Sequence, residues 1–338
     1  MDRINKFNLL NNKISKLANY PYHSRVHLLK TLGSKTHPCY IKRDDELGFG
    51  ITGSKLRKYL SLLTYLLEQQ TEQALLIGGA YSNHITSLVQ LLIENDIEPI
   101  LFLLGNPDYA LKGNLLLTSL MVPKDNIHWI SRADWSLIDK TVEDYTKCHE
   151  SKHLTIIPEG AFMAEALPGA LTLAIDILKN EQELNIHFDH IFIDAGTGLS
   201  AMAIILAFAW LKNTVCVHVL LLADTAEFFL QKLNQVKNDF KKLLDISEND
   251  DFIINNFQLH FPTQGQSFGS TNQATFQHIA HIMRHEGIFT DPIYSAKLFY
   301  ETNLLLKDND LKGNTLLIHS GGGLTLLGFQ DQLARTLL

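Results

Sequence analysis

Apolar and polar residues along this chain follow two different patterns. Short, nearly continuous apolar runs are separated by stretches in which apolar residues recur every three to four positions, as in Leu56, Leu60 and Leu63. The runs predict buried strands, and the longer period predicts amphipathic helices. The predicted strands are residues 74–78, 99–104, 127–130, 154–157, 190–194, 215–222 and 314–319. The predicted helices cover about 56–67, 83–95, 135–150, 166–178 and 225–244, and further helices begin near residues 200 and 324.

Apolar strands that alternate with helices are typical of parallel sheets covered on both faces, with right-handed crossovers. The predicted fold class is therefore α/β. No internal repeat, low-complexity segment or long linker marks a domain boundary. Residues 244–256 and 260–272 are polar and rich in Gly, Asn and Gln, and predict loops.

Composition narrows the class of protein. The 338 residues predict one large domain or two smaller ones, and 46% hydrophobic against 19% charged residues leaves ample material for a core. A net charge of −7 without a basic run disfavours nucleic-acid binding. The widely spaced Cys39, Cys148 and Cys216 form no Cys-x-x-Cys motif, so we expect free thiols in a reducing, cytoplasmic compartment.

The chain shows no sign of export or membrane insertion. Residues 1–20 are polar and hold no apolar signal core, so we expect no secretory signal. The longest apolar stretch, residues 201–211, is too short to cross a bilayer, which needs about 20 residues. It predicts a buried helix, and we expect no membrane partner.

A lysine stands at the start of the first predicted helix. Lys55 follows the glycine-rich turn at residues 47–50 and precedes Leu56. From the junction of a flexible turn and a helix its amine can project into a cleft, where burial lowers the pKa of a lysine. Such an amine is a nucleophile toward an aldehyde, and pyridoxal phosphate is the obvious one. The alternative is a surface lysine, like other lysines nearby.

Two glycine-containing segments follow predicted strands, where ligands bind in open α/β folds. Residues 78–84 (Gly-Gly-Ala-Tyr-Ser-Asn-His) place polar side chains together, although Ser82 and Asn83 could simply cap a helix. Residues 194–200 (Asp-Ala-Gly-Thr-Gly-Leu-Ser) open a helix with glycines, whose free N–H groups can converge on an anion. They predict a phosphate cup, with a plain strand–helix turn as the alternative.

Two later segments also carry turn and polar residues. In residues 291–297, a proline fixes the turn and Tyr294 enters the next helix, which also suits a core tyrosine. In residues 318–323, a strand ends in Ser320 and three glycines. Successive glycines lose much conformational entropy on folding, so they suggest that something flat or charged lies close to the backbone. Ser320 could exchange a hydrogen bond with a ring nitrogen.

In this order, the motifs resemble the pyridoxal-phosphate enzymes related to the tryptophan synthase β subunit, and more narrowly the D-cysteine desulfhydrase and aminocyclopropane-carboxylate deaminase family. The likeness runs from Tyr40 to Gly328. It implies two open, twisted, mostly parallel sheets with helices on both faces and pyridoxal 5′-phosphate in the cleft between two domains. The small domain would be residues 56–157, and the large one 1–55 plus 158–338. A homodimer acting on a small amino acid is implied as well.

The resemblance also implies the roles of individual residues. Lys55 would hold the cofactor as a Schiff base, and Ser82 and Tyr294 would act on the substrate. The other cofactor-binding positions would be Lys58, Asn83, Gly196, Thr197, Gly198, Leu199, Ser200 and Ser320. The other substrate-binding positions would be Tyr81, Asn83, His84, Glu159 and Phe268.

The chain departs from the family pattern at four places. Tyr81 replaces a frequent Gln, Phe268 replaces a tyrosine, and residues 158–165 differ from the usual loop. Ser295 stands where the deaminases typically have a glutamate, which favours a desulfhydrase-like β-elimination giving a keto acid and ammonia. Aminocyclopropane-carboxylate deaminase, D-serine ammonia-lyase and a catalytically degenerate cofactor-binding relative stay open as alternatives.

Other clusters of polar residues have simpler interpretations. His281 and His285 share one helical face and resemble half of a zinc site, but no third ligand is evident, and a solvated helix explains them better. The same holds for His149 and His153, and the acidic residues 44–46 suit a charged loop. We therefore expect no metal.

Overall fold

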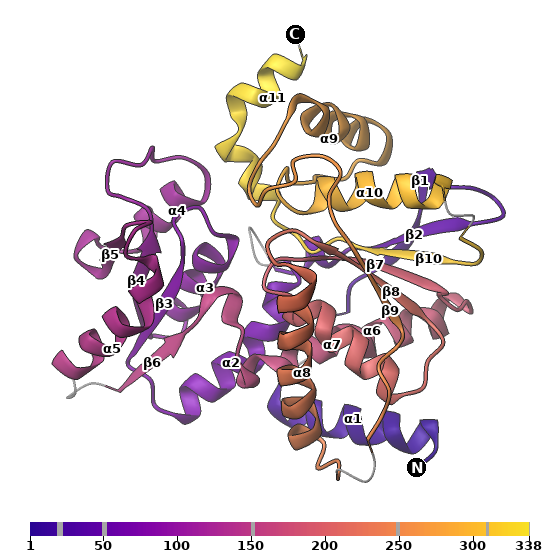
Figure 1. Ribbon diagram of the computed structural model, residues 1–338, viewed down its shortest axis with the longest axis horizontal. Coiled ribbons are helices and arrows are strands. Elements are labelled where there is room, and N and C mark those ends of the chain that lie inside the picture. Colours follow the sequence, from indigo (N-terminus) through magenta and orange to yellow (C-terminus); the bar gives the residue numbers. More distant parts are fainter. Residues whose placement is uncertain (19–22, 49–52, 150–152, 248–250, 309–310, 338) are drawn as a thin grey trace.

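The computed structural model describes residues 1–18, 23–48, 53–149, 153–247, 251–308 and 311–337, and it contains two separate sheets (Figure 1). The smaller sheet has four strands in the order β5-β4-β3-β6, all parallel. They are β3 (Gln73–Gly79), β4 (Glu98–Leu104), β5 (Ile127–Ile130) and β6 (Leu154–Ile157).

The larger sheet has six strands in the order β1-β2-β10-β7-β8-β9. They are β1 (Val26–Gly33), β2 (Pro38–Lys42), β7 (His190–Ala195), β8 (Cys216–Leu221), β9 (Phe257–His260) and β10 (Thr315–Ile318). Only the edge strand β1 runs antiparallel to its neighbour; the other pairs are parallel. Because β10 lies between β2 and β7, segments far apart in the sequence end side by side.

Helices connect and cover the strands. The α-helices are α1 (Arg3–Leu17), α2 (Lys55–Glu68), α3 (Asn83–Ile93), α4 (Gly113–Met121), α5 (Ile138–Cys148), α6 (Leu167–Leu184), α7 (Leu199–Trp210), α8 (Ala226–Leu243), α9 (Gln273–Glu286), α10 (Ser295–Asp308) and α11 (Gln330–Leu337). Short 3-10 helices are Asp44–Glu46, Lys124–Asn126, Trp135–Leu137, Glu159–Ala161, Ala164–Ala166 and η7 (Gly323–Gly328).

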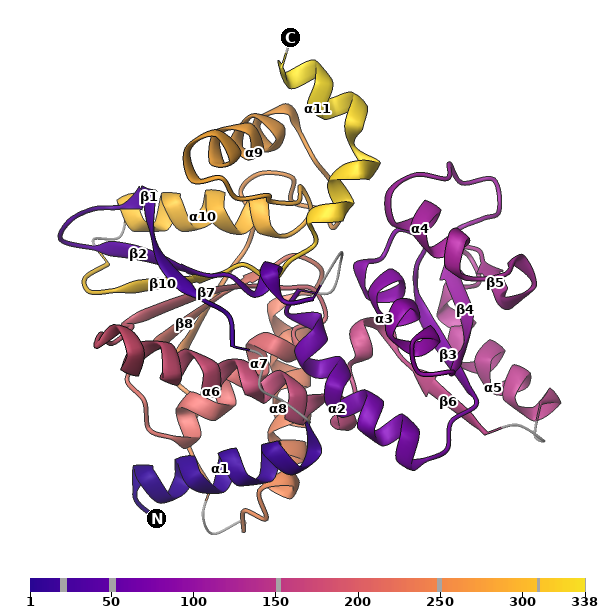
Figure 2. The same ribbon diagram turned by 180° about the vertical axis from the view of Figure 1, so that it is seen from behind.

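The large sheet has one core on each face. Ile191 and Val217 face α6 and α7, whereas Phe192 and Leu220 face the side covered by α9 and α10. Figures 1 and 2 show α10 on one side of this sheet and α6, α7 and α8 on the other, with α2 between the two sheets. Helix α7 is apolar all round and almost wholly buried, as expected of a helix packed between a sheet and other helices.

The predicted strands and long helices are present, and the α/β fold class is confirmed. Sequence patterns missed α1, α4, β1, β2 and β9, of which β1 and β9 are the two edges of the large sheet. The helix expected near residue 324 is the 3-10 helix η7, with α11 after it. Phe49 and Gly50 of the predicted turn lie outside the described residues. The domain limits at 55/56 and 157/158 remain a proposal.

Other predictions concern the chain as a whole. All three cysteines are free: Cys39 is buried, Cys148 exposed and Cys216 half-buried. None of the helices in the described part of the chain combines the length and the apolar character needed to cross a membrane.

A buried ion network anchors the first turn of α2. Arg57 is 1% exposed, and its guanidinium donates to both carboxylate oxygens of Asp44 at 2.6 and 2.7 Å and to Asp176 of α6 at 2.7 Å. Lys42, at the end of β2, donates to the same Asp176 oxygen at 2.6 Å. Burial opposes ionisation of Asp176, but these two cations outweigh it and hold the pKa of its carboxyl below the usual range.

We expect Arg57→Met to destabilise the protein strongly, because it leaves two carboxylates buried with fewer partners. Breaking a buried ion network by removing one partner lowers the free energy of unfolding by roughly 3–5 kcal/mol. Urea denaturation measures the loss. The control is Arg25→Met, which breaks the exposed pair with Glu46 and should change the free energy of unfolding by about 1 kcal/mol at most. Equal losses in the two variants would contradict this account.

Candidate functional site

The candidate site forms where the start of α2 meets the segment after β10. The N–H and hydroxyl of Ser54 both donate to the carbonyl of Ser320, at 3.0 and 3.2 Å. Gly53 has a φ of 49°, and a Cβ at that position would lie 2.3 Å from the same carbonyl oxygen. Only glycine permits this approach, so the turn before Lys55 is pressed against Ser320.

Lys55 is half-buried among acidic and aromatic side chains. Its Nζ lies 5.5 Å from the ring centroid of Tyr294, and the charges of Asp194 and Asp291 act on it. Burial lowers the pKa of the Lys55 amine, while the two carboxylates oppose this shift. Among the described residues, no hydrogen-bond partner is found for this amine. It is therefore a nucleophilic amine within an acidic site.

The two carboxylates are held in different ways. Asp194, at the end of β7, accepts a 2.8 Å hydrogen bond from the Ser320 hydroxyl, and burial raises the pKa of this carboxyl. Asp291 is fully buried and accepts from the N–H groups of Ile293, Tyr294 and Ser295 and from the Ser295 hydroxyl. Ser295 therefore supplies no carboxylate of its own, as a glutamate at this position would, but holds the carboxylate of Asp291 in place.

Tyr294 contacts several parts of the site. Burial, reinforced by Asp291 and Asp194, raises the pKa of its phenol, which therefore stays protonated at neutral pH. A Cβ on Gly196 would lie 3.5 Å from the phenol oxygen, so the glycine loop and Tyr294 are neighbours. Phe268 packs edge-on against Tyr294, with ring centroids 6.0 Å apart.

Asn83 brings a polar group from the small sheet to the same place. Its Oδ1 accepts hydrogen bonds of 2.8 Å from Asn114 of α4 and from Thr325 of η7. Its Nδ2 lies 3.1 Å from where a Cβ of Gly322 would be, and no acceptor for this amide is found among the described residues. Asn83 is 6% exposed, so a largely buried side chain brings its amide nitrogen close to the triple glycine.

The loop of residues 196–200, which is predicted to bind an anion, stands at the amino end of a helix. It leads directly into α7, and Gly198 caps this helix with a φ of 91°. Gly196, Thr197 and Ser200 are half-buried, while Gly198 and Leu199 are buried. Lys58 donates a hydrogen bond to the carbonyl of Gly160. A Cβ added to Gly160 would collide with Thr197, so Gly160 packs directly against this loop. Lys58 is therefore close to this loop.

The remaining predicted residues are placed differently. Ser82 caps α3, and its hydroxyl oxygen accepts from the His84 N–H, which leaves its own hydrogen available. His84 is buried, and its Nδ1 lies 2.8 Å from the Tyr59 hydroxyl. Tyr81 is 41% exposed and stacks on Tyr109. Glu159 is exposed.

Asp194 and Asp291 received no role from the sequence, yet the charges of these two carboxylates act on the Lys55 amine. One signal could have found the first. Asp194 ends the apolar run Ile191-Phe192-Ile193, where a carboxylate becomes buried and needs a partner. Asp291 gives no comparable signal, because its neighbours in the sequence resemble an ordinary turn.

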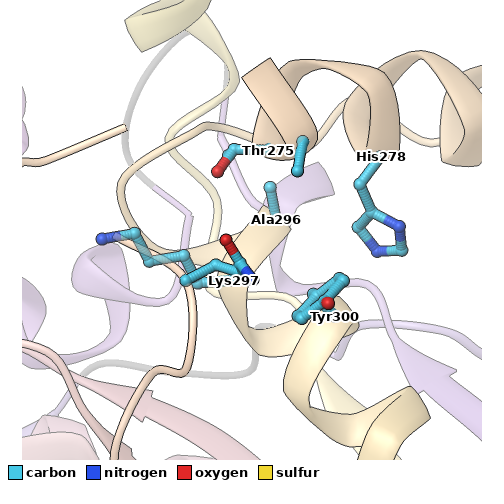
Figure 3. Close-up of a pocket in the computed structure, with 7 residues that line it drawn as sticks. Thr275, His278, Ala296, Lys297 and Tyr300 are labelled. Carbon is cyan, nitrogen blue, oxygen red and sulfur yellow. The ribbon is translucent and has the colours of Figure 1, made fainter. Parts of the chain in front are cut away.

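A separate small pocket lies between α9 and α10 (Figure 3). Thr275, His278, Ala296, Lys297 and Tyr300 line it, and its volume of about 10 Å³ is roughly the space of one water molecule. It does not include Lys55 and is too small for a cofactor.

The residues together suit a carbonyl compound that carries an anionic tail. The amine of Lys55 can attack the carbonyl, and the N–H groups at the start of α7 can bind the anion. Tyr294, whose ring centroid lies 5.5 Å from that amine, can donate a proton there.

Known proteins resemble this chain over most of its length. An aminocyclopropane-carboxylate deaminase of Cyberlindnera saturnus is 25% identical, covering 94% of this chain and 97% of that protein. A bifunctional D-cysteine desulfhydrase/aminocyclopropane-carboxylate deaminase of Arabidopsis thaliana, named as mitochondrial, is 28% identical, covering 87% of this chain and 75% of that protein. No protein-family model matches the chain.

A solved structure, an aminocyclopropane-carboxylate deaminase homologue, superposes with a TM-score of 0.83 at 23% identity and covers 97% of this chain and 98% of that one. The predicted tryptophan synthase β-like fold is confirmed. The predicted similarity to desulfhydrases and deaminases is confirmed as well.

We expect Lys58 to make stability depend on pH. Burial, and then the charge of Lys55, lowers the pKa of Lys58 to about 7 from its ordinary 10.5. Between these values the unfolded chain holds a proton that the folded protein has released. The Lys58 contribution to the free energy of unfolding therefore rises with pH, by up to ~1.4 kcal/mol per unit, and is lost as pH falls toward 7.

Urea unfolding of the wild type and of Lys58→Met measures this slope between pH values of roughly 7 and 10. The difference between the two proteins should grow with pH, whereas the exposed control Lys140→Met should follow the wild type. Parallel curves for the wild type and Lys58→Met would show that Lys58 keeps its proton in the folded state.

Proposed function

We propose that this relative of aminocyclopropane-carboxylate deaminases and D-cysteine desulfhydrases is a pyridoxal-phosphate-dependent lyase that deaminates a small amino acid. The observation that carries the proposal is the Lys55 amine, whose pKa is lowered by burial beside Asp194, Asp291 and Tyr294. The similarity to the Arabidopsis and Cyberlindnera enzymes over most of the chain supports the same reaction class.

The residues present fit the cofactor. The Asn83 amide, for which no acceptor is found among the described residues, would bind a ring hydroxyl. The loop of residues 196–200 and Lys58 would hold the phosphate, and Lys55 would form the covalent bond. The Ser320 hydroxyl already donates to Asp194, so its oxygen can only accept from a ligand. This end of the site therefore suits a protonated ring nitrogen.

Pyridoxal phosphate, when bound, stabilises negative charge at the Cα atom of an attached amino acid. Lys55 would take the proton from Cα, since its lowered pKa favours the free amine. Tyr294 would donate a proton, because its raised pKa keeps the phenol protonated. Ser82 can add a second donor, since its oxygen already accepts from the His84 N–H.

We infer β-elimination as the reaction. Loss of the Cα proton and of the Cβ substituent, followed by hydrolysis, gives a keto acid and ammonia, with sulfide if the substrate is D-cysteine. Two observations support a desulfhydrase-like substrate over aminocyclopropane-carboxylate. The Ser295 hydroxyl donates its hydrogen to Asp291, and Phe268, which packs on Tyr294, has no hydroxyl. A homodimer in the cytoplasm is part of the same proposal, supported by the resemblance and the free cysteines.

Lys55→Ala should lose the covalent cofactor and lower turnover by roughly 10³-fold or more. Borohydride reduction followed by mass spectrometry measures the covalent attachment, and release of keto acid measures turnover. The matched control is Lys140→Ala on the exposed face of α5, which should retain both properties. A covalent adduct that survives in Lys55→Ala would remove the basis of the proposal.

A substrate panel separates the alternatives. We expect keto acid and ammonia from D-cysteine, slower release from D-serine, and little from the L enantiomers or from aminocyclopropane-carboxylate. Preference for aminocyclopropane-carboxylate would assign the ring-opening deaminase instead. Cofactor binding without turnover of any compound would indicate the degenerate relative.

A further inference from the structure

Three histidines and a cysteine gather on one face of the large sheet. His190 begins β7, Cys216 begins β8, His218 lies two residues further along β8, and His260 ends β9. The register pairs His190 with Cys216 and Leu220 with His260. Alternate residues of a strand share a face, so all four side chains lie on the side of the sheet that α10 covers (Figure 1).

The side-chain atoms are close enough to share one ion. His190 Nδ1 and His218 Nε2 lie 3.0 Å apart, and the ligand atoms of His190, Cys216 and His218 all lie within 4.8 Å of one another. Tetrahedral zinc, with bonds of about 2.0–2.3 Å, places nitrogen and sulfur ligands roughly 3.3–3.6 Å apart. Small rotations of partly exposed side chains would reach that geometry.

Outer contacts orient both histidines toward this point. His190 Nε2 lies 3.1 Å from the Lys312 carbonyl, which can only accept, so Nε2 carries the hydrogen and the Nδ1 lone pair faces the cluster. His218 Nδ1 lies 3.0 Å from His260 Nε2, and Phe192 stacks on the His218 ring at 4.4 Å. Metal-binding histidines are usually held in this way through their second nitrogen.

We propose that His190, Cys216 and His218 form a binding site for a zinc-type divalent metal ion. Two imidazoles and a thiolate are donors that zinc prefers, and water would take the fourth position. His218 is 2% exposed, but His190 and Cys216 are half-buried, so an ion can enter. His260 and the Lys312 carbonyl are positioning groups.

This site is separate from the Lys55 site. His190 and Ala195 stand at opposite ends of β7, about 16 Å apart for five strand residues. A bound ion would join the amino ends of β7 and β8 to the segment before β10. Because the ion would lie away from the Lys55 site, Cys216→Ser should leave amino-acid turnover unchanged.

Titration of the chelator-treated holoenzyme with Co²⁺ tests the proposal. We expect one equivalent to bind, with ligand-field bands of tetrahedral cobalt at longer wavelength than cofactor absorption, and Zn²⁺ to displace it. Cys216→Ser and His190→Gln should each weaken binding at least about tenfold, and His260→Gln by roughly 10–100-fold. These variants avoid the buried His218, whose replacement could prevent folding.

Two controls exclude other ligands. Cys148→Ser removes an exposed cysteine of α5, and His281→Gln combined with His285→Gln removes the histidine pair of α9; binding should survive in both. Absence of stoichiometric binding would show that the three rings form only a hydrogen-bonded chain. Binding that persists in Cys216→Ser and His190→Gln, or is lost in the α9 double variant, would equally overturn the proposal.

Discussion

The buried guanidinium of Arg57 is the constraint on which the candidate site depends. It stands two residues after Lys55 and bonds to Asp44, which follows β2, and to Asp176 of α6. Charges in a protein interior are tolerated only when they are paired and fully hydrogen-bonded, so these contacts permit few positions of the first turn of α2. The direction of the Lys55 side chain follows from that restriction.

The residues of the candidate site come from both sheets and meet where the two sheets face each other. Asn83 comes from the helix that follows β3, whereas Asp194 lies near the end of β7 and Ser320 follows β10 of the other sheet. The hydrogen bond from Thr325 to Asn83 links the two sides. The strands of both sheets end at this place. One ligand can therefore be surrounded by the Lys55 amine, the two carboxylates and the Asn83 amide.

Much of the fold could be predicted from the sequence, because long apolar runs and the 3.6-residue period are local signals. The motifs around Lys55, Asn83, Gly196 and Ser320 could also be found, since turn residues after strands are visible in order. The pairing of Ser320 with Asp194 could not, because it depends on β10 lying beside β7. The Arg57 network and the row of histidines could not be predicted either, because their members come from separate strands and helices that only the folded chain brings together.

The strand order also bears on how the chain folds during synthesis. The four strands of the small sheet are contiguous within residues 73–157 and can pair as soon as they leave the ribosome. Strand β2, by contrast, is separated from β7 by β10, whose residues 315–318 are made after β2, β7, β8 and β9. Until then the centre of the large sheet has open edges, which are the surfaces most prone to aggregation. We therefore expect the order of folding to run from the small sheet to the large one.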